Sequence, residues 1–460
     1  MSDFDTIFKA YDVRGTVPDQ LNSRMCRAIG WGFARFAQSQ KVIVGRDMRG
    51  SGVELSAAFS AGARAAGVDV VEIGLASTDL FYFASGRTNL PGAMFTASHN
   101  PAQYNGMKFC LSGARPVGVE SGLGEVKAIA EQAMSAGEDL GDPKGQFEYL
   151  EFIDEYANHV RSFLPKEQLR PLSVVADTAN GMGGLVVPAV FDGLGVELHV
   201  LFGELDGTFP NHPADPIQPA NLVDLKKSVL ERGADVGLAF DGDADRVFLV
   251  DERAHEVSGS LTTALVARAM LEKHPGATIL YNIICSHVVP ETILEYGGKP
   301  VRTRVGHSYI KGVMAETDAV FGGEHSGHYY FRDNFRADSG IIAAMVVLGM
   351  MSTTGRPLSA LLAPYRKYSD SGEVNLEHPD PAGAVEAVAE KLIAAGEKVD
   401  RTDGLTVEHS DWWFNLRPSN TEPLLRLNVE AQTDQECEEH VREVIDLVTE
   451  ASGKEPARHE

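Results

Sequence analysis

The sequence predicts an α/β protein with three similar mixed α/β domains in tandem and a smaller C-terminal α+β domain. Its length of 460 residues is too great for one hydrophobic core, which predicts roughly three or four domains. A joint of helix, glycine and strand recurs along the chain at intervals of about one domain. Towards the C-terminus this pattern gives way to strand, loop, strand and helix, which is typical of a small α+β domain.

The first domain is expected to contain a parallel strand–helix–strand unit. The run from Lys41 to Gly45 predicts a buried strand, and Val68 to Ile73 predicts the next one. Between them, Ser51 to Ala66 predicts a helix, with Ser51 as its N-cap and Gly67 as its end. Short links between these elements favour a parallel sheet. Upstream, Tyr11 to Gly15 is expected to be a polar loop, and downstream Ala93 to Phe95 a short buried strand.

The joint at Gly67 resembles two later segments, those around Gly195 and Gly297. Three related domains in tandem would explain the three copies. Any α/β protein uses glycine between helix and strand, so the repeat is suggestive and no more.

Polar or Gly/Pro-rich stretches suggest where the domains end. The expected domains are 1–147, 148–252, 253–366 and 367–460. In the last of these, Trp412 to Leu416 and Leu424 to Val429 predict two strands joined by a polar turn. The segment from Asp434 to Thr449 predicts an amphipathic helix after them.

Composition narrows the classes of function. The formal net charge of −24 argues against nucleic acid or an anionic membrane as a partner. No apolar run approaches the roughly 20 residues that a membrane span needs. The first residues lack the pattern of a signal peptide, so the expected location is cytoplasmic. The cysteines are far apart and are expected to be buried and free; they are Cys26, Cys110, Cys285 and Cys437.

The first candidate site is the turn from Thr96 to Pro101, directly after a predicted strand. It contains Ser98 beside His99, with Lys108 a few residues further on. A serine hydroxyl needs a base or a metal to become a nucleophile, and lysine pairs well with phosphate. For a serine and a histidine considered alone, an ordinary polar turn is the better interpretation.

The second candidate is the loop with Asp241, Asp243, Asp245 and Arg246, between two apolar strands. Carboxylates at alternate positions repel one another unless a cation lies among them. Oxygen ligands of this kind suit Mg²⁺, and the arginine can bind phosphate. A calcium EF-hand is excluded because Arg246 takes the place of its required glycine. A solvated acidic turn fits less well than a metal site.

The third and fourth candidates are loops that offer hydrogen-bonding groups. The segment from Gly322 to His328 follows the apolar run from Ala319 to Phe321 and contains groups that can bind sugar hydroxyls. Its two histidines lack a third zinc ligand at usable spacing, and a simple turn is an equally good interpretation. The turn from Arg417 to Pro423 is rich in donors and suits phosphate, although an ordinary hairpin loop is the better interpretation of this segment considered alone.

The occurrence of all four loops in this order decides between these interpretations. Each loop follows a strand, at the sheet edge where open α/β proteins bind ligands. The set resembles the α-D-phosphohexomutase family over essentially the whole chain, and within it most resembles bacterial phosphomannomutases, including those that also act on glucose. The resemblance implies four domains around a central cleft.

The same resemblance implies an intramolecular phosphotransferase that interconverts hexose 6-phosphate and hexose 1-phosphate, of mannose and also of glucose. Ser98 would carry the phosphoryl group, and a hexose 1,6-bisphosphate would be the intermediate and activator. One Mg²⁺ per subunit would be held by Asp241, Asp243, Asp245 and a phosphate oxygen on Ser98. The only partner implied is the phosphorylated hexose, with no obligate protein partner.

The resemblance also assigns roles to the remaining residues. The catalytic set would be Ser98, Lys108, Arg14, His99, Arg246, His307 and His328, with proton transfer left open among Lys108, His307 and His328. The substrate-binding set would be Tyr11, Arg304, Gly306, Glu324, Ser326, Arg417, Ser419, Asn420 and Thr421.

Some family members have a lysine in the strand that corresponds to Tyr281 to Cys285, and this chain has none there. Two alternatives remain at this point: a phosphoglucosamine mutase and a Mg²⁺-dependent sugar phosphatase in which Ser98 is never phosphorylated. A sugar-phosphate binder without activity is disfavoured, because a binder needs no nucleophile.

Overall fold

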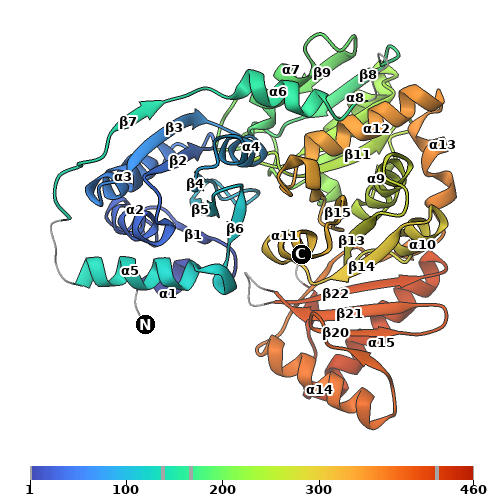
Figure 1. Ribbon diagram of the computed structural model, residues 1–460. Coiled ribbons are helices and arrows are strands. Elements are labelled where there is room, and N and C mark those ends of the chain that lie inside the picture. Colours follow the sequence, from blue (N-terminus) through green and yellow to red (C-terminus); the bar gives the residue numbers. More distant parts are fainter. Residues whose placement is uncertain (1–2, 136–139, 165–168, 420–423, 459–460) are drawn as a thin grey trace.

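Four sheets follow one another along the chain (Figure 1). The computed structural model describes residues 3–135, 140–164, 169–419 and 424–458. We call each sheet with its helices a unit, numbered from first to fourth. The expected class, three mixed α/β units and a smaller α+β unit, is confirmed. The expected limits at residues 147, 252 and 366 stay a prediction.

The first sheet has the strand order β1-β5-β4-β2-β3-β7, with β6 paired to β5. Val42 and Val44 of β2 pack on one hydrophobic cluster, with Phe33 and Phe59, while Ile43 between them packs on another. This alternation is why the sheet is covered on both faces. Its elements are α1 (Asp3–Ile7), β1 (Val13–Thr16), α2 (Ser23–Ala37), β2 (Lys41–Arg46), α3 (Gly52–Ala65), β3 (Asp69–Leu75), α4 (Thr78–Thr88), β4 (Gly92–Phe95), β5 (Tyr104–Leu111), β6 (Arg115–Val117), η1 (Val119–Ser121), α5 (Leu123–Ser135) and β7 (Phe147–Tyr149).

The second sheet has the order β12-β11-β10-β8-β9, with β8, β9 and β10 parallel and β11 antiparallel to β10. The antiparallel pair β10 and β11 forms the hairpin whose connecting loop carries the three aspartates. The elements of this unit are α6 (Ile153–Arg161), β8 (Ser173–Asp177), α7 (Gly183–Phe191), β9 (Glu197–Leu201), η2 (Pro219–Leu222), α8 (Val223–Arg232), β10 (Val236–Phe240), β11 (Val247–Asp251) and β12 (Glu256–Val257).

The third sheet has the order β14-β13-β15-β16, again with one antiparallel edge strand. Helix α12 is apolar all round and buried from Gly340 to Met351, because it packs among helices of three units. The elements are α9 (Gly259–Lys273), β13 (Thr278–Asn282), α10 (Val288–Glu295), β14 (Lys299–Thr303), α11 (His307–Thr317), β15 (Phe321–Gly323), β16 (Tyr329–Phe331), η3 (Arg332–Asn334), α12 (Gly340–Thr354), α13 (Leu358–Leu362) and η4 (Ala363–Tyr365).

The fourth sheet is antiparallel, in the order β19-β20-β21-β22-β18-β23 with β17 paired to β22, and α14 and α15 pack on it. Its elements are β17 (Ser369–Asp370), β18 (Val374–Glu377), α14 (Pro381–Ala394), β19 (Val399–Asp400), β20 (Leu405–Glu408), β21 (Trp413–Pro418), β22 (Leu424–Ala431), α15 (Asp434–Ser452) and β23 (Ala457–Arg458). The two strands and the helix predicted here are confirmed.

The three helix–glycine–strand joints are confirmed. Gly67, Gly195 and Gly297 stand between α3 and β3, α7 and β9, and α10 and β14, with φ of 88°, 70° and 73°. A side chain is strained at these angles, so glycine suits the turn into each strand; Gly67 and Gly297 directly follow the C-cap of their helix, whereas α7 already ends at Phe191. The four cysteines are buried and free, as expected.

Two expectations about local structure were wrong. The segment Val13–Thr16 is strand β1, paired antiparallel with β5, and not a polar loop. Its polar character reflects its place at the sheet edge. The third candidate loop does not follow a strand from Ala319 to Phe321: the strand is Phe321–Gly323, so the two glycines belong to β15. Ser51 does precede α3, but its side chain makes no capping hydrogen bond.

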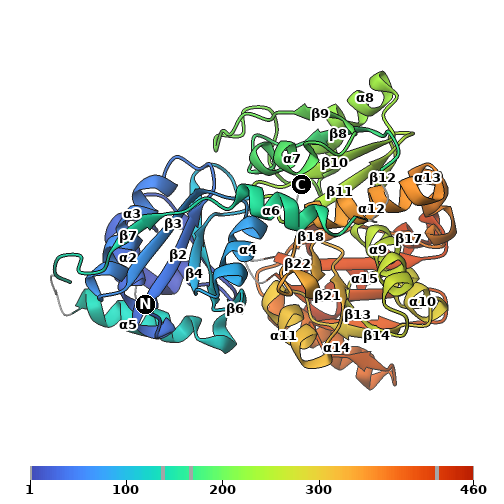
Figure 2. The ribbon, with the colours of Figure 1, turned by 45° about the horizontal axis from the view of Figure 1, so that its top comes forward.

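The three α/β units meet around α6, which runs between α4 and α12 (Figure 2). Apolar residues of α4, α6, α7, α9 and α12 form one continuous hydrophobic cluster. Within the described residues, no single helix has the length and hydropathy of a membrane span; α12 meets the test only together with Leu358–Tyr365, across a bend of 96°.

Candidate active site

The serine turn is held rigidly by the first unit. Ser98 is buried and adopts a left-handed φ of 49°, which a side chain tolerates only where surrounding contacts impose it. Its backbone N–H donates to Thr96 Oγ1 at 2.9 Å. Its carbonyl accepts from the Arg49 guanidinium at 2.8 Å. Its hydroxyl points into the second unit and donates to Asp241 Oδ2 at 2.8 Å.

The aspartate loop lies directly opposite this hydroxyl. Asp241, Asp243 and Asp245 are at most 1 % exposed, and each offers an oxygen within 4.8 Å of the others. The loop approaches the serine turn so closely that a Cβ on Gly242 would lie 2.4 Å from the Ser98 carbonyl oxygen. Only a glycine permits this contact between two backbones.

Two cations from different units neutralise part of the triad. Lys108 Nζ, from β5, donates to Asp243 Oδ2 at 2.8 Å and to Asp245 Oδ2 at 2.6 Å. Arg246 Nε donates to Asp241 Oδ2 at 2.9 Å. Three carboxylates thus face two cations.

The pKa values follow from burial and this pairing. Burial raises the pKa of Asp241 to about 8, although Arg246 opposes the shift. Burial also raises the pKa of Asp245, with Asp243 acting in the same direction. For Asp243 burial is outweighed by Lys108 and Thr78, and the pKa falls far below its usual value. The pKa of Lys108 is raised well above its usual value, because Asp243 and Asp245 outweigh its burial.

The residues of the triad fit a divalent cation. Asp243 Oδ1 and Asp245 Oδ1 are buried and have no hydrogen-bond partner among the described residues. A buried carboxylate oxygen without a donor is costly, and such atoms call for an explanation. Hard oxygen ligands from three carboxylates suit Mg²⁺, which neutralises charge on a phosphate. The triad could therefore hold a metal ion.

The other predicted groups around Ser98 come together as well. His99 Nδ1 lies 3.4 Å from Ser98 Oγ. Burial, with the nearby cations Arg246 and Arg14, holds the pKa of His99 well below its usual value, so its ring is neutral. Arg14 bonds to Asp12 and to Asn100 at the end of the serine turn.

The third loop places a carboxylate deep in the site. Glu324 is 2 % exposed and accepts from Tyr330 Oη at 2.6 Å, Asn282 Nδ2 at 3.2 Å and the Gly306 N–H at 3.1 Å. Four residues on, His328 Nδ1 lies 3.0 Å from Ser326 Oγ.

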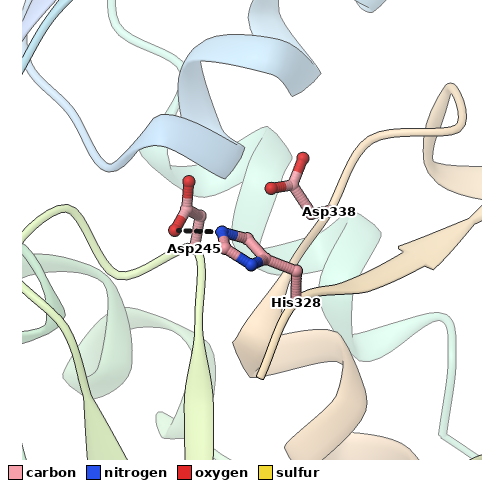
Figure 3. Close-up of side chains that lie close together, drawn as sticks. All are labelled: Asp245, His328 and Asp338. Carbon is pink, nitrogen blue, oxygen red and sulfur yellow. Dashed lines mark ion pairs between the residues drawn. The ribbon is translucent and has the colours of Figure 1, made fainter. Parts of the chain in front are cut away.

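His328 connects this loop to the aspartates. Its Nε2 lies 3.7 Å from Asp245 Oδ1, as the dashed line in Figure 3 shows. Asp338 lies on the other side of the ring, where it pairs with buried Lys311 at 2.7 Å. The third unit thus contributes an imidazole to the edge of the metal site.

The first unit also reaches the third at the N-terminal segment. The ring of Tyr11 packs against Gly306, where a Cβ would lie 2.9 Å from it, and edge-on against Tyr309. Arg304 lies further out: 47 % of its side chain is exposed, stacked on Tyr309 with Glu120 3.9 Å away. Tyr11 and Gly306 are therefore brought together, while Arg304 lies at the rim.

The fourth unit presents a buried arginine. Arg417 is 3 % exposed and donates to Glu373 at 2.7 Å, and Arg426 pairs with the same carboxylate at 3.3 Å. The Ser419 N–H donates to the Leu424 carbonyl at 2.8 Å, closing the turn. The predicted residues Asn420 and Thr421 lie outside the described residues, and so does the side chain of His307.

Several residues that support the site were not predicted from the sequence. Thr78 Oγ1 donates to Asp243 Oδ2 at 2.6 Å, and Arg49 holds the serine turn. Their partners lie 165 and 49 residues away along the chain. The one signal available was position, since Arg49 and Thr78 each lie three residues after a strand, β2 and β3, as the candidate loops lie after theirs.

Comparisons with known proteins cover most of the chain. Four segments match the domains of phosphoglucomutase/phosphomannomutase: the alpha/beta/alpha domains I, II and III at residues 5–136, 149–256 and 258–368, and the C-terminal domain at 373–447.

Individual relatives agree with this. A phosphomannomutase of Salmonella montevideo is 38% identical over 454 residues, covering 96% of this chain and 99% of that protein. One of Escherichia coli K12 is 38% identical over 436 residues, covering 93% and 95%. A solved family protein from Burkholderia thailandensis superposes with a TM-score of 0.87 at 32% identity and covers 98% of both chains. The chain therefore belongs to the phosphoglucomutase/phosphomannomutase family.

Proposed function

We propose that this enzyme interconverts hexose 6-phosphate and hexose 1-phosphate, of mannose and also of glucose, by way of a phosphoryl group on Ser98. One observation carries the proposal: the Ser98 hydroxyl donates to Asp241 at 2.8 Å, inside a carboxylate cluster from another unit. A serine placed there has its phosphate next to a cation site. Relatives that are 38% identical and named phosphomannomutase support the reaction class.

In the first transfer, the bond between phosphorus and Ser98 Oγ breaks while a bond forms to the free hydroxyl of hexose 1-phosphate. The proton of that hydroxyl passes to a base on the protein. The resulting 1,6-bisphosphate turns over in the site and returns its other phosphate to Ser98, which restores the enzyme. Bound Mg²⁺, one per subunit on Asp241, Asp243 and Asp245, would supply charge neutralisation to the phosphate.

Charge stabilisation and proton transfer are assigned to residues around Ser98. Lys108 lies beside the carboxylate cluster, where it donates to Asp243 and Asp245. From there it would supply positive charge at the transferring phosphate, as Arg14 and Arg246 would. Of the two residues named for proton transfer whose side chains are described, Lys108 and His328, we assign the role to His328, which has a partly exposed ring between Ser326 and Asp245. His99 packs against the serine, and its neutral ring adds no charge there.

Substrate binding is assigned to the third and fourth units. Glu324 and Ser326 would hold sugar hydroxyls, which must suit both orientations of the bisphosphate. Arg417, Ser419, Asn420 and Thr421 would hold the phosphate that is not reacting. Tyr11, Gly306, Arg304 and His307 would border the sugar on the side of the first unit.

Intact-mass measurement tests the carrier role directly. We expect one phosphate on the enzyme as isolated, located at Ser98 by peptide analysis and lost with excess hexose 1-phosphate, which carries it away as the bisphosphate. Ser98→Ala should reduce turnover by at least about 1,000-fold while hexose phosphate still binds. Near-normal turnover by this variant would reject the proposal.

A substrate panel separates the alternatives. Mannose, glucose and glucosamine 1-phosphates are compared by kcat/KM, and release of inorganic phosphate is followed in the same samples. Preference for the first two sugars without phosphate release supports the proposal. Preference for glucosamine indicates the phosphoglucosamine mutase, and stoichiometric phosphate release indicates a phosphatase.

A further inference from the structure

Asp79 is a buried carboxylate that the reaction described above does not use. It lies in the first turn of α4 and is fully enclosed. Its Oδ1 accepts from the Leu80 N–H at 2.8 Å and from the Ser77 hydroxyl. Its Oδ2 accepts from Ser339 Oγ at 2.7 Å and from the hydroxyl of Tyr156. Asp79 thus joins α4 of the first unit to α6 of the second and to α12 of the third.

Helices α4 and α12, whose N-terminal ends meet at Asp79, also touch the aspartate loop. At the start of α4, the Thr78 N–H donates to the Asp243 carbonyl at 3.0 Å, and Thr78 Oγ1 donates to the Asp243 carboxylate at 2.6 Å. At the start of α12, a Cβ on Gly340 would lie 2.6 Å from the carbonyl carbon of Arg246. The loop is therefore held from behind by the two helix N-termini that Asp79 ties together.

The chemistry of this junction suits an ionised carboxylate. Helix N-termini attract negative charge, and α4 and α12 both present theirs, since Ser339 is the N-cap of α12. Four donors satisfy the two oxygens and partly offset the cost of burying the charge, although burial still raises the pKa of Asp79 to about 6. An apolar residue would pack there too, but it would leave the hydroxyls of Tyr156 and Ser339 without their acceptor.

A second contact ties the same segments together nearby. Lys311 Nζ lies 3.8 Å from the ring centre of Tyr82, which is on α4, and pairs with Asp338 at 2.7 Å. Asp338 directly precedes Ser339 and faces His328 (Figure 3). The junction around Asp79 therefore lies against the candidate metal site on two sides, at Asp243 through Thr78 and at His328 through Asp338.

We propose that Asp79 is a positioning residue that fixes the aspartate loop, through α4 and α12, in the geometry that binds the divalent cation. The proposal rests on the metal site assigned to Asp241, Asp243 and Asp245. Asp79 itself does not touch that cation. Groups that hydrogen-bond a metal ligand directly, as Thr78 does to Asp243, commonly change metal affinity by about 10- to 100-fold when they are removed, and Asp79 lies one contact further from the ligands.

The test measures Mn²⁺ binding to the full-length, dephosphorylated enzyme by electron paramagnetic resonance, beside kcat, KM and the melting temperature. Asp79→Asn should raise the Mn²⁺ dissociation constant about 10-fold and lower kcat by a similar factor, with KM for the hexose phosphate unchanged. Tyr156→Phe removes one hydrogen bond to Asp79. Ser339→Ala removes another, together with the N-cap bond that Ser339 Oγ accepts from the Ile342 N–H at 3.3 Å. Both variants should produce smaller shifts in the same direction.

Glu252→Gln is the matched control. Glu252 accepts from the Ser359 N–H at 3.1 Å and from its hydroxyl, so it also joins the second unit to the third. It lies at the far end of the β10–β11 hairpin from the aspartate loop, and its replacement should leave Mn²⁺ affinity unchanged.

The outcomes are distinct. Unchanged Mn²⁺ affinity in the Tyr156 and Ser339 variants, with or without a fall in melting temperature, would overturn the proposal, and these variants remain informative if Asp79→Asn does not fold. Failure of the unaltered enzyme to bind Mn²⁺ would reject the metal assignment and this proposal with it. An equal loss of affinity in Glu252→Gln would show a general effect of loosened units, which also overturns it.

Discussion

Arg49 shows how much of the site depends on single side chains outside it. Its guanidinium donates to the carbonyls of Ser98, Asn100, Pro101 and Tyr104, at 2.6 to 3.0 Å, and to the Asp47 carboxylate at 3.2 Å. All five N–H groups of the planar fork are thus used. A buried ion pair rarely adds much stability, but this one fixes a turn of strained backbone.

We expect Arg49→Lys to lower kcat by at least about 10-fold with little change in KM. A lysine offers three donors on one nitrogen and does not reach four carbonyls, so Ser98 loses its fixed orientation. Steady-state kinetics measures the effect.

Arg64→Lys is its control, because Arg64 also donates to a backbone carbonyl of the first unit, that of Gly145, far along the chain from Ser98. A wild-type kcat for Arg49→Lys would show that the turn is held without this side chain.

The residues that sequence reasoning found have a common property: each lies in a short loop with several chemical groups in a row. Ser98, Asp241 and Glu324 are of this kind, and the structure brings their loops together. Thr78 and Arg49 were missed because a lone threonine or arginine has no pattern until its distant partner is known. Lys108 was named by its proximity to Ser98, and its contact with the aspartates appears only in three dimensions.

At the scale of elements, apolar runs predicted the central strands well. The runs beginning at Lys41 and Val236 are strands, because both faces of these sheets are covered. The edge strand β1 was missed, since an edge strand is short and polar. The start of β15 was predicted two residues early, because Ala319 and Val320 are buried without belonging to the sheet.

The contact between the serine turn and the aspartate loop gives a prediction for Gly242→Ala. The new methyl group would meet the Ser98 carbonyl oxygen at 2.4 Å, and both atoms belong to backbones that cannot rotate away. We expect activity to fall at least about 10-fold and stability to fall by about 1–3 kcal/mol, as measured by kcat and urea denaturation.

Gly124→Ala should do neither, because Gly124 lies in α5 with open space around it. Retention of full activity by Gly242→Ala would mean that the two loops can separate without loss.

A titrating group on β3 predicts how stability depends on pH. Burial raises the pKa of Glu72 to about 7, although Arg46 opposes the shift. The folded state then binds a proton on Glu72 more tightly than the unfolded state does. The resulting contribution to the free energy of unfolding is complete below the ordinary pKa of a glutamate and is lost as pH rises through 7. Glu72→Gln should remove it.

The variant should gain about 1–2 kcal/mol relative to the unaltered protein between pH 4.5 and 8, a figure reduced for the partial exposure of Glu72. Urea denaturation at several pH values measures the difference. Parallel pH curves for the two proteins would contradict the assignment.

At the scale of the molecule, the proposed function depends on side chains that different units contribute to one site. A protein with a net charge of −24 binds a phosphorylated sugar only if it gathers its cations locally. The proposed site would do so with Arg14 and Lys108 from the first unit, Arg246 from the second and Arg417 from the fourth. The sequence predicted the number and class of the units, but not how they pack, because helices such as α12 are apolar all round and reveal no preferred neighbour.

Removal of the metal should lower both the activity and the thermal stability of the protein. Chelation leaves three buried carboxylates against two cations, so we expect activity to vanish and the melting temperature to fall by a few degrees. Added Mg²⁺ should restore both, as followed by a coupled assay and by calorimetry. Activity that persists after exhaustive chelation would contradict the metal assignment.

The hydrogen bond between Ser339 and Asp79 spans 260 positions of the chain, and this has a consequence for biosynthesis. While the first unit leaves the ribosome, α6 and the third unit do not yet exist, so the face of α4 around Phe83, which packs against Tyr156 of α6 and against Phe335, is uncovered. A fragment that ends near β7 would display this face to solvent and is expected to aggregate. We therefore expect the first three units to fold as one block and the nascent enzyme to need protection until the third unit is made.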